Sequence, residues 1–368
     1  MALAASATLT GSLASAADSH TFRWSYQGDV NSLDPMVLSE SFTLGFQFAF
    51  YEPLVAYDEN LNLTPALAVS WENPEPTKWV FHLREGVKFH NGVSFDASVV
   101  KFSLDRARAE DSTNAQKQFF EPIEAIETPD EHTAVIRLKQ PTGLFLYHLA
   151  WGDAVMVEPG SAESNRTDPV GTGPFKFASW QRGSKVELVR NDDYWGEKAK
   201  TEKIVFKIIP DESTRRQELE AGTIHGYDLP NPVDWADHEA AGNSVEIRPA
   251  FNILYIGLNA THNDALLDVN VRKALSHAIN RDQLVASQLP DGAEAASQFF
   301  PEALTGYNYD LEVDAYDPEL ARELLAEAGH SDLTIDFWLP TEVTRPYMPD
   351  PANIYDAIRA DWEAVGIT

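Results

Sequence analysis

Few side chains in this sequence stand at spacings that could carry out catalysis. Residues 171–176 form a glycine-rich run with a lysine, but the run lacks the spacing and the Ser or Thr after the lysine that a phosphate-binding loop requires. The ten histidines include no H-E-x-x-H motif, and there is no G-x-S-x-G nucleophile elbow. Paired carboxylates such as Asp192 and Asp193 are expected by chance among 57 acidic residues. We therefore expect a binding protein that is not an enzyme and that holds no cofactor or metal.

The composition is that of a large, folded and acidic protein. The 368 residues carry 28 basic and 57 acidic side chains, a formal charge of -29, and 43% of them are apolar. This length corresponds to about two or three domains. Nucleic-acid binding depends on clustered Lys and Arg, so the acidic balance argues against a nucleic-acid partner. The absence of cysteine excludes disulfides, thiolate nucleophiles and cysteine-based zinc sites.

The N-terminal residues indicate export. Residues 1–17 are uncharged and rich in Ala, Leu, Ser and Thr, and small residues precede Asp18 as they do at a secretory cleavage site. The basic segment that opens such signals is missing, so we interpret 1–17 as a signal peptide remnant, with a disordered tail as the alternative. No later run reaches the roughly 18 apolar residues that span a bilayer. We expect a periplasmic, extracytoplasmic protein without stable membrane insertion.

Short apolar strands and amphipathic helices alternate along the chain, which predicts an α/β fold. Strands are expected at 79–83, 133–138, 185–189, 203–209 and 333–339, and helices at 96–108, 214–220, 269–286, 317–328 and 353–365. A strand followed by a crossover helix normally leads to a second parallel strand. Residues 366–368 read as the beginning of such a strand, so we expect that a C-terminal part of the fold is missing.

Several distinctive segments follow one another along the chain: Leu-Asp-Pro at 33–35, the run at 81–90, Pro-Val-Gly-Thr-Gly-Pro-Phe at 169–175, Asp-Tyr-Trp-Gly at 193–196 and Val-Arg-Lys-Ala-Leu at 271–275. Together and in this order they resemble the extracytoplasmic solute-binding proteins of peptide-type ABC importers, known as family 5. The resemblance covers essentially the whole chain after residue 17. Segments 248–252, 344–347 and 358–362 are most similar to the dipeptide-binding branch.

The resemblance implies a two-lobed periplasmic-binding-protein type II fold with an extra inserted domain (cluster C). In this sequence an incomplete lobe I would comprise 18–50 and 168–255, the inserted domain 51–167, and a truncated lobe II 256–368. Hinged closure of two lobes around a ligand is a recognised switching mode. The implied role is that of a monomer that captures short peptides, in particular dipeptides, and delivers them to the permease subunits of an ABC importer.

The resemblance also implies ligand-binding residues near the C-terminus. Arg345 matches the family's partner for the ligand carboxylate, and its guanidinium fork suits that group, although a surface salt bridge is the alternative. Tyr347 lies two residues further on, so it would point to the same side of an extended segment. The aspartate that anchors the ligand amine in this branch lies beyond Thr368.

Further predicted ligand-binding residues lie near the N-terminus. Ser39, Glu40 and Ser41 match a pocket-lining segment of the branch, where Glu40 either attracts the ligand ammonium or is an exposed acid at a helix start. Phe119 aligns with a pocket-facing aromatic residue, but core packing is the favoured interpretation.

Two alternatives stay open at this point. The same family role could serve another solute, such as an oligopeptide, glutathione, an opine, a sugar or a metal chelate, because the matching segments belong to the scaffold. A secreted hydrolase with dispersed carboxylates is the weaker alternative.

Overall fold

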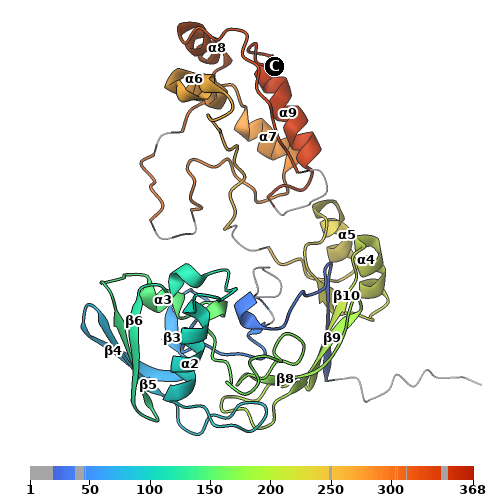
Figure 1. Ribbon diagram of the computed structural model, residues 1–368. Coiled ribbons are helices and arrows are strands. Elements are labelled where there is room, and N and C mark those ends of the chain that lie inside the picture. The colour runs from blue at the N-terminus through green and yellow to red at the C-terminus, as the bar shows by residue number, and fades with distance from the viewer. Residues whose placement is uncertain are drawn as a thin grey trace, which may run out of the picture. The chain divides into compact units, whose positions relative to one another are not determined.

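The computed structural model describes residues 20–37, 45, 47–247, 251–302, 304, 306–311, 313–340 and 347–368. The chain divides into two compact units, residues 1–228 and 229–368, called here the first and second units. The first unit contains sheets with short helices between them, whereas the described part of the second unit is built from helices and extended segments (Figure 1). The fold is thus mixed α/β, as the sequence predicts. The limits of lobe I, the inserted domain and lobe II stay predictions.

A mixed five-stranded sheet forms one part of the first unit, in the order β11-β1-β10-β9-β8. Its strands are β1 (Thr21–Tyr26), β8 (Phe175–Gln181), β9 (Lys185–Arg190), β10 (Lys203–Ile208) and β11 (Gly226–Tyr227). The strand β1 pairs in parallel with β10 and β11, and the other pairs are antiparallel. The helix α4 (Glu212–Glu220) follows β10, and Asp211 caps it by accepting a hydrogen bond from the Thr214 N–H. The predicted strands at 185–189 and 203–209 are confirmed.

A four-stranded antiparallel sheet forms the other part, in the order β4-β5-β7-β6. Its strands are β4 (Ala68–Glu75), β5 (Lys78–Leu83), β6 (Ile123–Asp130) and β7 (Thr133–Leu138), and a separate ribbon joins β2 (Val55–Tyr57) to β3 (Leu63–Pro65). The helix α2 (Ala97–Arg108) contacts β6 and β7. Val100 and Leu104 of this helix are fully buried in the core cluster that also contains Phe81. Asp96 caps α2 as its position predicts, because a side-chain oxygen there satisfies an otherwise unpaired N–H.

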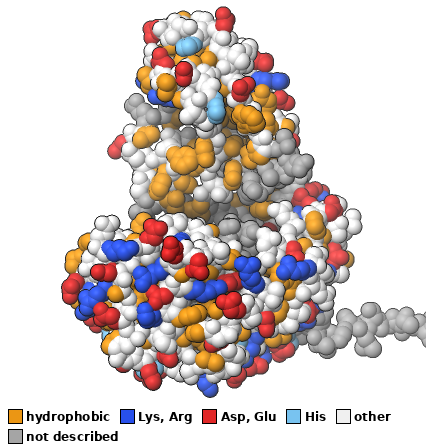
Figure 2. Space-filling view, in the orientation of Figure 1, with side chains coloured by type: hydrophobic (Ala, Val, Ile, Leu, Met, Phe, Trp, Pro, Cys, Tyr) orange, Lys and Arg blue, Asp and Glu red, His pale blue; other side chains and the backbone are white. Residues whose placement is uncertain are grey.

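In the second unit, the helices that follow residue 263 pack around one apolar cluster. Its elements are η5 (Pro232–Asp234), α5 (Trp235–Ala240), η6 (Asp264–Leu267), α6 (Val269–His277), α7 (Arg281–Gln288), α8 (Pro318–Glu327) and α9 (Pro351–Glu363). Leu275, Leu325 and Trp362 are buried together in this cluster. Other apolar side chains stay on the surface of the unit (Figure 2), and Tyr309 and Trp338 are 72% and 91% exposed.

The prediction of one continuous helix over 269–286 is wrong. The helix α6 ends at His277, and α7 begins after Asn280, whose side chain accepts a hydrogen bond from the Gln283 N–H. The Asn280 N–H itself donates to an Asp361 carboxylate oxygen on α9, at 2.9 Å. This long-range bond and the local cap satisfy the backbone at the break, which the apolar periodicity does not reveal.

The segment 333–339, predicted as a strand, is not assigned as one. The Thr368 N–H donates to the Leu333 carbonyl (2.9 Å), and the Ile335 N–H donates to the Thr368 carbonyl (2.8 Å). This alternation is the pattern of a parallel pair. Leu333, Ile335 and Thr368 thus pair as neighbouring parallel strands do, but the pairing is too short for the strand predicted over 333–339 to be assigned.

Candidate functional site

The predicted ligand-binding residues do not all fall within the described structure. Ser39, Glu40, Ser41 and Arg345 lie outside the described residues. Tyr347 is half-buried in the second unit, ahead of Asp350, which caps α9. Phe119 is half-buried in the first unit. Phe119 and the described residues that precede Ser39 both belong to the first unit, whereas Tyr347 belongs to the second.

A buried ion pair fixes the chain just before Ser39. Arg106 of α2 donates from both terminal nitrogens to the two carboxylate oxygens of Asp34, at 3.1 and 2.5 Å. Asp34 is only 2% exposed, and it also accepts a hydrogen bond from the Met36 N–H. Such a two-point bond between a guanidinium and a carboxylate sets position and orientation together. It therefore holds η2 (Pro35–Val37), the last described element before the predicted pocket segment.

The short helix η4 (Gly152–Ala154) packs against η2 and α2. Its central residue, Asp153, is 1% exposed, and its Oδ1 atom has no hydrogen-bond partner among the described residues. Burial raises the pKa of Asp153 to about 6, although hydrogen bonds from its own backbone and from the Trp151 side chain act to lower it. The carboxyl of Asp153 is thus shielded from solvent.

Three rings meet beside η4 and form what we call the aromatic corner: Phe119, His148 and Trp151. The ring of Phe119, at the end of η3 (Lys117–Phe119), stacks on His148 with 4.1 Å between centroids and 10° between planes. The Trp151 ring stands perpendicular to Phe119, at 6.3 Å and 89°. Phe119 also packs against the core, so the favoured packing interpretation describes one side of it. Burial lowers the pKa of His148, which keeps the imidazole neutral at pH 7.

Sequence reasoning missed His148, Trp151 and Asp153. His148 closes the short helix α3 (Phe145–His148), which Phe145 and Leu149 anchor in the core with no exposed surface. The available signal was the sequence Trp-Gly-Asp at 151–153, in which an aromatic and an acid flank a glycine within an otherwise apolar stretch.

The glycine-rich run proves to be a packing junction. A Cβ atom on Gly171 would lie 1.9 Å from the Phe50 carbonyl oxygen, and one on Gly173 would lie 2.6 Å from that of Ala49. The His90 ring bridges the two glycines, because Nδ1 accepts from the Gly171 N–H and Nε2 lies 3.0 Å from the Gly173 carbonyl. The glycines therefore permit close backbone approach, as the turn interpretation of this run requires.

Glu52 is a second buried carboxylate at this junction. It accepts hydrogen bonds from the Thr172 hydroxyl (2.7 Å), the Tyr194 hydroxyl (2.6 Å) and the Trp195 indole N–H (2.7 Å). Burial raises the pKa of Glu52, and the three donors act in the opposite direction. These three hydrogen bonds join segments that are distant in sequence, so Glu52 has a structural role.

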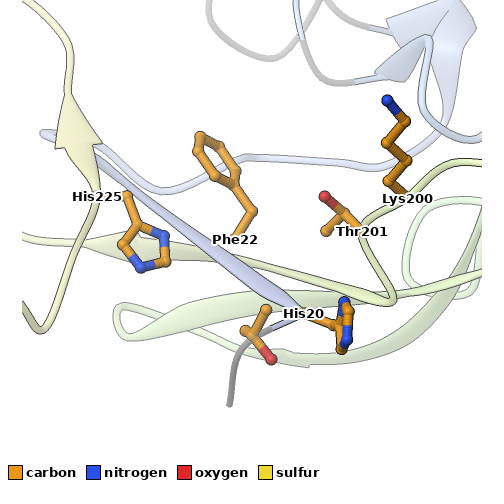
Figure 3. A pocket seen from close by; sticks show the side chains of 6 residues that line it. His20, Phe22, Lys200, Thr201 and His225 are labelled. Atoms are coloured by element: carbon orange, nitrogen blue, oxygen red, sulfur yellow. The ribbon is translucent and has the colours of Figure 1, made fainter.

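Two shallow pockets lie away from these residues. One, of about 290 Å³, is lined by His20, Thr21, Phe22, Lys200, Thr201 and His225 at one end of the five-stranded sheet (Figure 3). The other, of about 410 Å³, lies in the second unit along residues 282–295. Neither contains a predicted ligand-binding residue. Among the described residues there is no cluster of three metal-ligating side chains, and no helix is both long and apolar enough to cross a membrane.

Comparison with known proteins gives the family. The family model of bacterial extracellular solute-binding proteins, family 5 middle, matches residues 62–368. The chain is 30% identical to the dipeptide-binding protein of Escherichia coli K12, over 96% of this chain and 72% of that protein. It is also 30% identical to heme-binding protein A of Haemophilus influenzae, over 86% of this chain and 63% of that protein, which is less than two thirds of its length.

Solved structures of similar proteins share the fold. HbpA2 from Haemophilus parasuis superposes with a TM-score of 0.82 at 29% identity, over 95% of this chain and 74% of that one. The periplasmic binding protein DppA from Helicobacter pylori, in complex with the peptide STSA, gives a TM-score of 0.71 at 26% identity, over 94% and 72% of the two chains. With matches of this extent, the chain belongs to family 5 of the bacterial extracellular solute-binding proteins.

Proposed function

We propose that this protein captures short peptides, dipeptides in particular, outside the cytoplasm and delivers them to the permease subunits of an ABC importer. The similarity to a dipeptide-binding protein over 96% of the chain carries the proposal. Two further relatives are named as di/tripeptide-binding proteins, at 31% and 30% identity. The protein acts by binding and release, without chemical turnover.

A dipeptide is a zwitterion, and this determines what its site must supply. Burying either charge without a partner costs several kcal/mol, so both termini need a counter-charge or hydrogen bonds. Arg345 binds the carboxylate through its guanidinium fork, and Tyr347 lines the same side of the pocket. Ser39, Glu40 and Ser41 contribute as well, by the resemblance to the branch's pocket-lining segment.

The alternative is that the protein binds another solute in the same family role. Relatives at 30% and 31% identity are named for heme and for glutathione, so family membership alone does not select the ligand. A dipeptide is favoured because the segment around Arg345 resembles the dipeptide-binding branch, and because a relative that matches over 96% of this chain has that name.

Calorimetric titration with Ala-Ala, N-acetyl-Ala-Ala and Ala-Ala-amide tests the proposal. We expect Ala-Ala to bind and each blocked form to lose at least tenfold in affinity, because one charged terminus has lost its partner. Arg345→Ala should abolish the penalty for amidation along with most of the affinity. Arg359→Ala is the matched control, because Arg359 is half-exposed on α9, where it lies near Tyr355, Asp356 and Glu363 of the same helix.

Failure would take one of two forms. No heat with any of the three peptides would move the ligand to another solute class. Unchanged affinity in Arg345→Ala would remove the proposed carboxylate anchor while leaving peptide binding in place.

A further inference from the structure

We propose that the pocket at the start of β1 is a binding site for a small aromatic carboxylate. This pocket of about 290 Å³, called here the sheet-end pocket, is lined by His20, Thr21, Phe22, Lys200, Thr201 and His225. The strands β1, β10 and β11, which run in parallel, all begin beside it. It contains none of the residues assigned to the peptide, so the inference goes beyond the proposed function and does not depend on it.

The imidazole of His225 is held in a fixed orientation on one side of the pocket. The His225 N–H donates to the Arg23 carbonyl (2.8 Å), and the Arg23 N–H donates back to His225 Nδ1 (3.1 Å). The side chain thus extends the backbone pairing between β1 and β11. Because Nδ1 is the acceptor, the proton of the neutral ring is on Nε2. His225 is therefore a preorganised hydrogen-bond donor.

Phe22 forms the apolar wall of the pocket. Its ring contacts those of Trp24 and His225, with 5.9 and 5.8 Å between centroids. Gly226 makes room for these rings, because a Cβ atom there would lie 2.4 Å from the Trp24 ring. Phe22 remains 38% exposed, and Figure 3 shows it between His225 and Thr201. A planar ligand can stack on an aromatic face that is supported and exposed in this way.

The other side of the pocket offers polar donors. Lys200, Thr201 and His20 lie on this side of Phe22 (Figure 3), and within the described part of the chain their side chains have no hydrogen-bond or ion-pair partner. The His20 carbonyl accepts a hydrogen bond from the Glu202 N–H (2.9 Å), which joins β1 to the loop that carries Lys200. An ammonium beside a hydroxyl matches the charge and the acceptor oxygens of a carboxylate.

The charge of the lining favours an anion over a cation. None of the six described residues that line the pocket is acidic, although the chain has 57 acidic side chains. Glu202 is the acid nearest to Lys200 in the sequence, and its carboxylate lies 3.8 Å from the Arg190 guanidinium. Asp18, two residues before His20, lies outside the described residues, so a cation of the same shape belongs among the probes.

The size of the pocket favours an organic acid over an inorganic anion. Its volume is close to the lower limit of small-molecule sites, about 300 Å³. An inorganic oxyanion at Lys200 would leave the Phe22 ring without a contact. A benzoate-like molecule instead places its carboxylate near Lys200 and Thr201 and its ring on Phe22.

The experiment is an NMR titration of the full chain with benzoate, benzylamine and inorganic phosphate, followed through the histidine ring signals. His20→Gln and His225→Gln assign the two signals that benzoate should shift. We expect benzoate to bind about tenfold more tightly than benzylamine or phosphate, because it alone combines a negative charge with a ring. Lys200→Gln should weaken benzoate binding about tenfold. Lys198→Gln is the matched control, since Lys198 is an exposed lysine two residues earlier that does not line the pocket.

Phe22→Leu, which keeps apolar volume but removes the ring, should also weaken benzoate binding and leave phosphate unaffected. Unshifted histidine signals, benzylamine binding as tight as that of benzoate, or equal affinities in Lys200→Gln and Lys198→Gln would overturn the proposal. Phosphate binding as tight as that of benzoate would overturn the aromatic assignment. Saturating Ala-Ala should leave the benzoate affinity unchanged, and competition between the two would move benzoate to the peptide site and overturn the sheet-end pocket. Failure of Ala-Ala to bind would overturn the proposed function alone.

Discussion

Arg106 and Asp34 are 72 residues apart in sequence and meet in a two-point ion pair at 2.5 and 3.1 Å. Asp34 is almost fully buried, whereas a quarter of the Arg106 side chain reaches solvent. The pair joins α2 to the short helix η2. Because the carboxylate cannot be rehydrated in place, loss of the guanidinium would leave a buried charge without a partner.

Arg106→Ala should therefore lower the free energy of unfolding by about 3 kcal/mol. Urea unfolding followed by circular dichroism measures this change. Arg137→Ala is the control, since Arg137 pairs with Glu127 on an exposed face and should cost less than about 1 kcal/mol. Equal losses in the two variants would contradict the structural importance of the buried pair.

Gly171→Ala should be strongly destabilising, because its Cβ would lie 1.9 Å from the backbone oxygen of Phe50. Backbone must move to remove this overlap, so we expect a loss of about 3 kcal/mol or more. Gly143→Ala is the control, since a Cβ there meets nothing within 4 Å. Thermal unfolding of both variants provides the comparison, and a wild-type midpoint for Gly171→Ala would refute the close packing.

These cases separate what the sequence predicts from what it does not. The helices α2 and α8 form where expected because their signals are local: Asp96 and Asp317 cap them, and Gly329 follows α8 with a positive φ of 74°. The break between α6 and α7 depends on Asp361, 81 residues beyond Asn280, so helical periodicity could not reveal it.

In the candidate site, too, the sequence could suggest some residues and not others. Phe119 could be proposed from the family resemblance, but its neighbours could not. Trp151 and His148 reach Phe119 through the packing of α3 and η3 in one core, which is a long-range arrangement without a motif. An orphaned carboxylate oxygen such as that of Asp153 becomes visible only in three dimensions.

His90 should make the protein less stable in mild acid. Burial is the main cause that lowers the pKa of His90 from its usual 6.5 to about 4. Between these values the unfolded chain binds a proton that the folded chain does not, so stability is retained above pH 6.5 and falls as the pH decreases towards 4. The shift corresponds to about 3 kcal/mol.

His90→Gln should lose this dependence between pH 6.5 and 4, although its stability at pH 7 will be lower because two bonds to the glycines are perturbed. Urea unfolding at pH 7, 5.5 and 4.5 gives the slopes. His82→Gln is the control, since His82 lies on the exposed face of β5 and pairs there with Glu72. A wild-type slope in His90→Gln would show that another group is responsible.

The ionisation of Asp153 should change the stability with pH in the direction opposite to that of His90. Burial raises its pKa from 3.8 to about 6, so between these values the unfolded chain has released a proton that the folded chain retains. Its contribution to stability is complete below pH 3.8 and is lost as the pH rises through 6, by about 3 kcal/mol. Asp153→Asn removes the ionisation, so the variant should gain stability relative to the wild type as the pH increases from 5 to 8.

Unfolding free energies of Asp153→Asn and of the wild type at pH 5, 6.5 and 8 test this expectation. A variant that loses stability equally at all three pH values would show that the Asp153 carboxylate is satisfied in its ionised form. Its burial would then impose no electrostatic cost, and the orphaned Oδ1 atom would have a partner in solution.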